Sequence, residues 1–380
     1  AMSQKSSEMK AQGIDVINMS VGEPDFMTPD HVKEAGKKAI DDNFSKYSPV
    51  PGYPVLREAI VKKLKQENHL DYAVSEIVVG TGGKQGVCNA ILALVNPGDE
   101  VIIPAPYWVS YPQMVKLAGG IPVIVSAGIE QDFKITAEQL EHAITPKTKM
   151  IILCSPSNPT GSVYSAEELE SLAKVVLAHD DLFVLSDEIY EHINYIGGHC
   201  SIASCQGMKE RTILCNGVSK AYAMTGWRLG WVAAPEWIAK GINKLQGQYT
   251  SGTCSVSQMA AVAAYEADQA CVADYREAFR RRRDLIVRLA KEIPGLEVNV
   301  PQGAFYLFPK CSSYFGKTDG KHVIRSSSDL AMYILEEGGV ATVGGDAFGA
   351  PECFRMSYAT SDDNIKEALH RIKEVLSKLK

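Results

Sequence analysis

Residues 216–230 read Asn216-Gly217-Val218-Ser219-Lys220-Ala221-Tyr222-Ala223-Met224-Thr225-Gly226-Trp227-Arg228-Leu229-Gly230. Small and hydroxyl-bearing residues surround one lysine, Lys220, and an arginine, Arg228, follows two helical turns later along the chain. A lysine in this setting can hold an aldehyde cofactor as a Schiff base while a nearby guanidinium binds the phosphate of that cofactor. A lone lysine is more often a solvated surface charge, so this interpretation depends on partners elsewhere in the sequence.

Composition indicates a globular protein of two domains. The chain has 380 residues, of which 46% are apolar and 22% charged, and its formal net charge is −6. The charges are mixed, without a basic stripe for nucleic acid or a polybasic patch for a membrane. No long apolar run predicts a membrane span, and the polar N-terminus lacks the apolar core of a signal peptide. We therefore expect a cytoplasmic protein.

The cysteines and histidines predict no metal site. Nine cysteines are scattered singly, without a Cys-x-x-Cys pair, and we expect buried free thiols in a reducing compartment. His192 and His199 do not stand beside other ligand types in a metal-binding spacing. We expect no metal ion and no disulfide framework.

Seven short apolar runs predict an α/β fold. They cover residues 76–80, 100–104, 121–125, 149–153, 182–186, 212–216 and 229–234. Near-continuous apolar strands are typical of a mostly parallel sheet with helices on both faces. Helical patterns are expected at residues 166–179 and, more weakly, at 137–143.

The pattern changes after about residue 255. A helical stretch runs to residue 293 and contains the charge run Arg280–Arg283, which we interpret as a solvated face or a domain-bridging helix. Beyond it come expected strands and helices of a smaller α+β domain, at residues 296–300, 304–308, 328–337, 353–358 and 363–379. Residues 15–22 should return to this domain. The predicted division is an N-terminal segment (1–28), a large domain (29–293) and a small domain (294–380).

Three motifs follow predicted strands and offer groups for a ligand. Residues 80–86, Gly-Thr-Gly-Gly-Lys-Gln-Gly, form a glycine-rich turn into a helix that could bind phosphate or be an ordinary turn; the spacing is not that of a dinucleotide or ATP site. Trp108 can stack on a flat ring or lie in the core. Asn158, within Ser155–Gly161, can project its amide into a cleft or bond locally in a rigid turn.

Asp187 and Arg355 are two further residues that could bind a ligand. Asp187 lies at the end of a buried strand, where α/β sheets place ligands, and its carboxylate can keep a pyridine nitrogen protonated or cap a helix. Tyr190 lies three residues on and can reach the same ring. One helix-sized crossover separates Asp187 from Lys220, so the two should fall at the ends of neighbouring strands. Arg355, in a strand of the small domain, favours a carboxylate, either of a substrate or within the protein.

With these residues assembled, the chain resembles the class I aminotransferases of pyridoxal-phosphate fold type I across nearly its whole length, most of all bacterial aspartate aminotransferases with Gly-Gly-Lys at the phosphate turn. Supporting stretches are Ser20–Phe26 (Ser-Val-Gly-Glu-Pro-Asp-Phe), Lys46–Gly52 (Lys-Tyr-Ser-Pro-Val-Pro-Gly), Pro106–Pro112 (Pro-Tyr-Trp-Val-Ser-Tyr-Pro) and Met224–Arg228 (Met-Thr-Gly-Trp-Arg). The resemblance implies a seven-stranded, mostly parallel sheet in the large domain. The family's N-terminal arm, which embraces the partner subunit, is expected ahead of Ser20 and is mostly absent from the sequence.

The resemblance also implies a role for each site residue. Lys220 would be the Schiff-base lysine and proton shuttle, Asp187 the partner of the pyridine nitrogen, Asn158 and Tyr190 the partners of the ring oxygen, and Trp108 the stacking group. Gly83, Lys84, Ser219 and Arg228 would surround the phosphate, with Gly217 where other subgroups carry a serine. Tyr47 would reach the phosphate in the other subunit of a homodimer. Arg355, Asn158 and the Gly22 backbone would bind the α-carboxylate, Lys84 the distal carboxylate, and Thr250, Ser251 and Thr253 of the partner would border that pocket.

The implied reaction is a ping-pong transamination from aspartate, or a similar amino acid, to 2-oxoglutarate. Three alternatives stay open. The same reaction could act on the prephenate/arogenate pair, or its donor could be an aromatic amino acid or alanine. The protein could be a pyridoxal-phosphate-dependent lyase or synthase of the same fold. It could also be a non-catalytic pyridoxal-phosphate-binding regulatory domain, although such regulators carry a DNA-binding segment ahead of the aminotransferase-like part and only a short polar stretch precedes Ser20 here.

Overall fold

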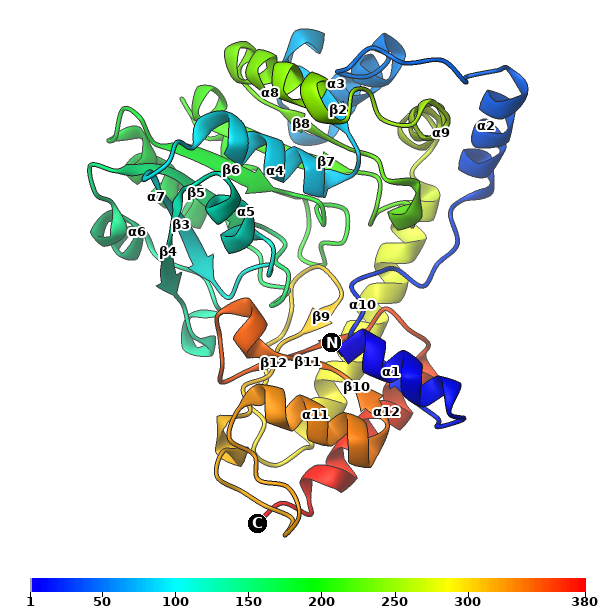
Figure 1. Cartoon of the computed structure of the whole chain (residues 1–380), viewed down its shortest axis with the longest axis vertical. Coiled ribbons are helices and arrows are strands. Elements are labelled where there is room, and N and C mark those ends of the chain that lie inside the picture. Colours follow the sequence, from blue (N-terminus) through cyan, green and yellow to red (C-terminus); the bar gives the residue numbers. More distant parts are fainter. Residues whose placement is uncertain (1) are drawn as a thin grey trace.

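The computed structural model describes residues 2–380, and its largest element is a sheet of seven strands (Figure 1). In spatial order these are β2 (Ile77–Gly80), β8 (Gly230–Ala233), β7 (Thr212–Gly217), β6 (Phe183–Asp187), β5 (Thr148–Cys154), β3 (Glu100–Ala105) and β4 (Ile121–Ser126). β8 runs antiparallel to both neighbours, whereas β7, β6, β5, β3 and β4 pair in parallel. The expected mostly parallel, seven-stranded sheet is confirmed, and each apolar run corresponds to one strand.

Helices cover both faces of this sheet because its strands are apolar on both sides. In β5, Met150 and Ile152 pack against one helical layer, and Ile151 and Leu153 pack against the other. The first layer contains α4 (Gly83–Leu94), α5 (Tyr111–Leu117) and α8 (Glu236–Tyr249). The second contains α3 (Pro54–Asn68), α6 (Ala137–Ala143), α7 (Ala166–Leu177) and α9 (Ser255–Glu266), and α2 (Asp30–Asp41) packs on α9. The helices predicted at 137–143 and 166–179 are thus confirmed as α6 and α7.

The helical stretch predicted at residues 255–293 is wrong in one respect, because it is two helices. α9 ends at Glu266 and α10 (Ala270–Lys291) begins after a break. Gln269 Nε2 donates to the carbonyls of Ala264 and Ala267, and the Asp268 carboxylate accepts from the N–H of Ala270. These side chains satisfy the helix ends without the proline or glycine that would mark a break in the sequence.

The C-terminal part is a smaller α+β domain. Its antiparallel sheet has the order β11 (Val343–Gly344), β12 (Phe354–Ser357) and β9 (Tyr306–Leu307), and it packs with α11 (Ser327–Gly338) and α12 (Asp362–Leu376). Residues 296–300, expected as a strand, contribute only an isolated bridge between Glu297 and Lys310. Glu297 and Lys310 exchange two main-chain hydrogen bonds, of 3.1 and 2.9 Å.

The N-terminal segment lies with the small domain. β1 (Ile17–Asn18) pairs in parallel with β10 (Val340–Ala341), and the Met19 carbonyl accepts from Ser357 N at 2.7 Å. The polar stretch before it forms α1 (Met2–Ala11), where Lys5 pairs with Glu336 of α11. We propose the division 1–28, 29–293 and 294–380 on this basis; residue 1 lies outside the described residues.

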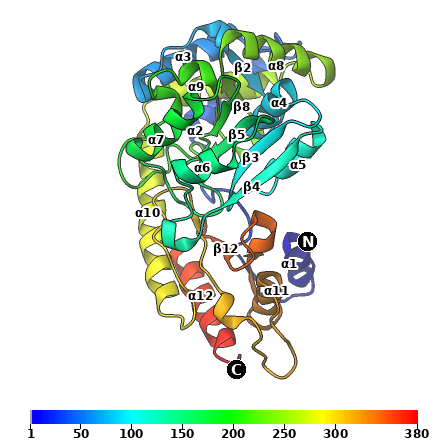
Figure 2. The same cartoon turned by 90° about the vertical axis from the view of Figure 1, so that its left-hand side faces the viewer.

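The long helix α10 joins the two parts of the molecule, running from the large domain alongside the small one (Figures 1 and 2). Its charge run bridges segments rather than facing solvent alone. Arg282 binds Asp25 through two hydrogen bonds of 2.7 and 3.0 Å, and Arg281 pairs with Asp362 at the start of α12. The domain-bridging interpretation is therefore the correct one. No helix within residues 2–380 is long and apolar enough to cross a membrane.

The close approach of β8 to α4 leaves no room for a side chain at Gly230. A Cβ built there would lie 2.2 Å from Gly83 N. We expect Gly230→Ala to lower the free energy of unfolding by about 1–3 kcal/mol, as overpacking does, measured by urea unfolding. Gly241→Ala is the matched control, because nothing lies within 4 Å of its Cβ position in α8, and it should stabilise by about 0.5–1 kcal/mol. Equal effects would show that β8 tolerates displacement from α4.

Candidate active site

A cavity of 670 Å³ opens beyond the carboxyl ends of β5, β6 and β7, the edge where α/β sheets place ligands. Loops of the large domain form one wall, and residues of the N-terminal segment and small domain form the other. The predicted site residues that line it are Gly22, Gly83, Lys84, Trp108, Asn158, Asp187, Tyr190, Ser219, Lys220, Arg228 and Arg355. Both domains are therefore needed to enclose the ligand.

Lys220 projects from the loop after β7 into this cavity. It is not on a helix: residues 219–224 form turns, so the spacing to Arg228 is not two helical turns. Its Nζ donates to the Gly22 carbonyl at 2.6 Å and lies 5.8 Å from the centre of the Tyr190 ring. Burial lowers the pKa of the Lys220 ammonium to about 8 although Glu23 opposes this shift. A neutral amine, which is both a nucleophile and a base, is thus accessible near physiological pH.

Asp187 is the last residue of β6, and β6 and β7 are parallel neighbours. The expected meeting of Asp187 and Lys220 at adjacent strand ends is what the structure shows. Asp187 is buried, and its Oδ2 accepts a hydrogen bond of 2.6 Å from the Tyr111 hydroxyl. Burial raises the pKa of Asp187, while the Tyr111 hydrogen bond acts to lower it. The carboxylate therefore favours a cationic partner in the cavity.

One end of the cavity is built for an anion. Gly83 and Lys84 form the first turn of α4, whose backbone N–H groups have no partners within the helix. The Arg228 guanidinium lies against this turn: a Cβ at Gly82 would be 2.4 Å from its Nη2. Ser219 adds a hydroxyl-bearing side chain to the same lining. A helix N-terminus and a guanidinium together favour a phosphate.

Arg355 forms the opposite, carboxylate-binding end. It lies on β12 with 7% of its surface exposed. Its two terminal nitrogens donate to Asn158 Oδ1 at 2.8 Å and to the Ser20 carbonyl at 2.7 Å. Among residues 2–380, no carboxylate lies within ion-pair distance of this guanidinium, and its Nε has no partner. A buried cation without an internal anion favours an anionic ligand.

Aromatic side chains shape the space between these two ends. Trp108 meets Tyr111 edge to face at 5.3 Å, and the Tyr190 and Tyr306 hydroxyls are hydrogen-bonded at 2.7 Å. Lys84 Nζ lies 4.9 Å from the centre of the Trp108 ring. A flat ring bound here would have an indole on one side and hydroxyl groups at its rim.

Some predicted residues lie away from the cavity of their own chain. Tyr47 is 97% exposed and is not among the lining residues. Thr253 bonds to Thr81 at 3.3 Å, and Thr250 accepts from Gln85 at 2.7 Å, beside the start of α4. Their expected roles in a partner's site remain predictions.

Two residues that the sequence reasoning missed support the site. Tyr111 holds Asp187, and Tyr306 holds Tyr190 and stacks with the Arg355 guanidinium at 4.6 Å. Tyr111 follows Trp108 within the stretch Pro106–Pro112, and its place in that stretch could have indicated a role in the site. Tyr306 lies in an apolar strand far along the chain, and nothing in its sequence neighbourhood indicated a contact with Tyr190.

Two expectations about single residues need correction. His192 and His199 do stand beside other ligand types, since His192 lies near Glu67 and Glu191, and His199 near Glu188 and Glu191. The carboxylates come from segments distant in the sequence or from direct neighbours, which spacing rules do not detect. The nine cysteines are free as expected, but only Cys215, Cys311 and Cys353 are buried; five others are half-buried and Cys254 is exposed.

Comparison with known proteins gives the family. The family model "Aminotransferase class I and II" matches residues 14–372. An aspartate/prephenate aminotransferase of Cereibacter sphaeroides is 49% identical over 375 residues, covering 98% of this chain and 94% of that protein. The aspartate aminotransferase of Rhizobium meliloti superposes with a TM-score of 0.96 at 44% identity, over 100% of this chain and 96% of that one. The Thermus thermophilus aspartate aminotransferase with maleate superposes with a TM-score of 0.93 at 41% identity, and the match covers 98% of this chain and 95% of that one.

This chain belongs to the class I and II aminotransferases. It is a pyridoxal-phosphate-dependent enzyme of fold type I, acting on amino acids and oxo acids. The residues present fit this cofactor: an anion site at α4, a buried carboxylate at Asp187, an amine of lowered pKa at Lys220 and the Trp108 ring stand around one cavity. A side chain at Gly82 would collide with the Arg228 guanidinium, so glycine is required beside this anion site.

The lowered pKa of Lys220 predicts its reactivity in the cofactor-free aminotransferase. Its modification by a small amine reagent should rise with a midpoint near pH 8, because the neutral amine dominates above it. Peptide mass spectrometry across the alkaline range would measure this rate. The unfolded chain keeps the proton up to the ordinary value of 10.5. The unfavourable contribution of Lys220 to stability is therefore full below pH 8 and fades as the pH rises to 10.5.

Lys220→Met is the control for this titration, because it should remove that pH-dependent part of the stability. A reaction midpoint at the ordinary lysine value would contradict the burial of the ammonium.

Proposed function

We propose that this aminotransferase moves an amino group from aspartate, or a similar dicarboxylic amino acid, to 2-oxoglutarate in a ping-pong reaction. The observation that carries the proposal is Arg355, a buried guanidinium without a carboxylate partner among the described residues. It lines the same cavity as Lys220. A carboxylate bound at Arg355 would bring the α-carbon of an amino acid to the lysine amine, which is the arrangement that proton transfer at that carbon requires.

The large-domain residues would hold the cofactor. Pyridoxal phosphate, when bound, supplies an aldehyde and a ring that withdraws electrons from the α-carbon. Gly83, Lys84, Ser219 and Arg228 would surround its phosphate, and Trp108 would cover one face of its ring. Asp187 would hold a proton on the pyridine nitrogen, because a buried carboxylate stabilises a neighbouring cation. Asn158 and Tyr190 would bond the ring oxygen.

Lys220 would then act as the base. Its Nζ takes the proton from the substrate α-carbon and returns it to the adjacent reacting carbon, because the lowered pKa leaves the amine neutral at mildly alkaline pH. The Gly22 carbonyl, which accepts from Nζ at 2.6 Å, can hold the ammonium form between these transfers.

Substrate recognition would divide between two cations. Arg355, with Asn158 and the Gly22 backbone, would bind the α-carboxylate, and Lys84 would bind the distal carboxylate. Two comparisons support a dicarboxylic donor. The bacterial relatives are named aspartate/prephenate aminotransferases, and the Thermus thermophilus structure carries maleate, a dicarboxylate.

Prephenate is a second candidate substrate, because the same relatives are named for it. Val343 and Phe348 give the cavity an apolar wall, and the Phe348 ring lies 4.9 Å from the Arg355 guanidinium. Such a wall can accept a ring-bearing oxo acid beside the carboxylate site.

We also propose a homodimer in the cytoplasm. Tyr47 is 97% exposed and does not line the cavity of its own chain, as expected of a residue that completes a partner's phosphate site. The nine free thiols support a reducing compartment.

A half-reaction scan tests the proposed function. The absorbance of the bound cofactor would be followed on adding single amino acids, and aspartate and glutamate should convert it fastest. Product analysis should find the matching oxo acid and no free ammonia. Lys220→Ala should abolish the conversion, because Lys84, the other amine in the cavity lining, is proposed to bind the distal carboxylate and not to move the α-proton. Conversion by Lys220→Ala without added amines would overturn the role of this lysine.

Lys84 should select the distal carboxylate. Replacing it in Lys84→Met removes a charged hydrogen bond and should weaken the binding of aspartate and glutamate in the transition state by about 1.5–3 kcal/mol. Donors without a second carboxylate should be unaffected or improved, so the measurement is kcat/KM across the donor panel. Lys116→Met, on the neighbouring α5, controls for loss of a positive charge. An equal fall for all donors would assign Lys84 to the phosphate or the fold.

A further inference from the structure

The loop after β6 has two faces with different surroundings. Asp187, Ile189 and Tyr190 line the cavity, whereas Glu188 and Glu191 are outside its lining and only 1% and 5% exposed. Two buried carboxylates behind the active site need partners, because an unpaired buried charge is costly. Glu188 accepts from Ser186, Ser201 and His199 at 2.6–2.8 Å. Glu191 reaches instead to a different helix.

Glu191 is bound by the C-terminal end of α3. Lys63 Nζ pairs with Glu191 Oε1 and donates to Asn68 Oδ1 at 2.7 Å, and Asn68 Nδ2 donates to Glu191 Oε2 at 2.9 Å. The three side chains therefore satisfy one another in a closed ring. Burial alone would raise the pKa of Glu191, but the Lys63 ammonium holds it well below its ordinary value.

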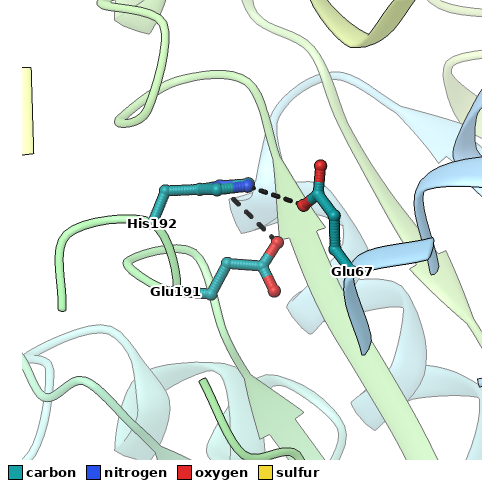
Figure 3. Close-up of side chains that lie close together, drawn as sticks. All are labelled: Glu67, Glu191 and His192. Carbon is teal, nitrogen blue, oxygen red and sulfur yellow. Dashed lines mark hydrogen bonds and ion pairs between the residues drawn. The ribbon is translucent and has the colours of Figure 1, made fainter. Parts of the chain in front are cut away.

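His192 approaches both Glu67 and Glu191 (Figure 3), and through Tyr222 it connects this cluster with the lysine loop. Its Nε2 lies 2.9 Å from Glu67, its Nδ1 lies 3.6 Å from Glu191, and its ring meets the Tyr222 ring edge-on at 6.2 Å. Tyr222 follows Lys220 closely in the same loop. We name Lys63, Glu67, Asn68, Glu191 and His192 the α3 cluster; it contacts both loops that carry the central cavity residues.

The α3 cluster contains side chains that could bind a metal ion, but the Lys63 ammonium already supplies a positive charge there. Lys63 Nζ is bonded to Glu191 and lies 3.5 Å from Glu67. An ammonium that neutralises both carboxylates fills the role a metal ion would have there. The cluster is thus an internal ion-pair network.

We propose that Lys63 and Glu191 are positioning residues, whose buried ion pair sets the placement of Asp187 and Tyr190 relative to Lys220. The loop is a turn, in which Glu191 N bonds to the Glu188 carbonyl and Ile193 N to the Tyr190 carbonyl. Main-chain bonds from Glu188 N to Cys215 and from Ala304 N to Ile193 hold its two ends, and the Glu191 side chain holds the stretch between them. A misplacement of about 1 Å at a reacting group can cost about a hundredfold in rate. This inference rests on the roles proposed above for Asp187 and Tyr190.

Glu191→Gln and Lys63→Met test the proposal in the holoenzyme. Lys63→Met leaves Glu191 without its ammonium partner, and Glu191→Gln leaves Lys63 only the longer ion pair of 3.5 Å with Glu67, so the loop should shift. We expect the dissociation constant of pyridoxal phosphate to rise about tenfold or more. We also expect the pH midpoint of the bound cofactor's absorbance to move, because it reports the surroundings of Lys220 and Asp187.

Lys65→Met is the matched control. It removes the same charge from the same helix, but its ion pair with Asp71 is exposed, with 70% and 81% of the side chains accessible. It should leave both readouts unchanged. If Lys63→Met and Glu191→Gln match this control while only their melting temperatures fall, the α3 cluster supports the fold alone and the proposal is wrong. Asp187→Asn separates the two hypotheses: an unchanged absorbance titration there would overturn the role of Asp187 itself.

Two further variants keep the test decisive if a single variant does not fold. Asn68→Ala retains both charges and removes only the hydrogen bonds to Lys63 and Glu191, so a smaller shift of the absorbance midpoint in the same direction is expected. No shift would count against the proposal. In the double variant Lys63→Met/Glu191→Gln, the two effects should be less than additive, because both singles break one ion pair. Additive effects would show that the two residues act independently.

Discussion

Desolvation of charged groups at one edge of the sheet is the constraint on which the rest of the site depends. Asp187, Lys220 and Arg355 are all withdrawn from water, and each charged form would be costly there without partners. The protein supplies a partial set: Tyr111 for Asp187, the Gly22 carbonyl for Lys220, and Asn158 with the Ser20 carbonyl for Arg355. Each of these three groups can still form one more hydrogen bond or ion pair. The charges that line the cavity are therefore preorganised to bind a cofactor and an amino acid.

The sheet and the main site residues were predictable because they follow local rules. Seven apolar runs specified seven strands, and a crossover between parallel strands brought Asp187 next to Lys220. The glycine-rich turn at residues 80–86 indicated an anion-binding site at the start of α4. It was recognisable because the strand, the turn and the beginning of the helix are all visible in the sequence. Family resemblance then supplied roles that the residue pattern alone left open.

What the sequence did not predict depends on contacts between distant segments. Tyr306 supports Tyr190 from another domain, and Glu67 meets His192 from α3. The end of α9 was not predicted either. The Gln269 side chain satisfies the carbonyls at this helix end, and no proline or glycine marks it in the sequence. The strand expected at residues 296–300 pairs at one position only, Glu297 with Lys310. In each case the deciding partner is specified by the tertiary fold and not by spacing.

The N-terminal segment has a consequence for how the site responds to a ligand. Arg355 and Lys220 both rest on its backbone, at the Ser20 and Gly22 carbonyls, and Met19 ties it to β12 through Ser357. The Arg355 and Lys220 side chains are therefore both hydrogen-bonded to the main chain of residues 20–22, which packs with the small domain. A carboxylate that displaces the Ser20 carbonyl from Arg355 would also affect the hydrogen bond that Lys220 makes to Gly22. We therefore expect carboxylate binding at Arg355 and the hydrogen bonding of the Lys220 amine to be coupled through the main chain of residues 20–22.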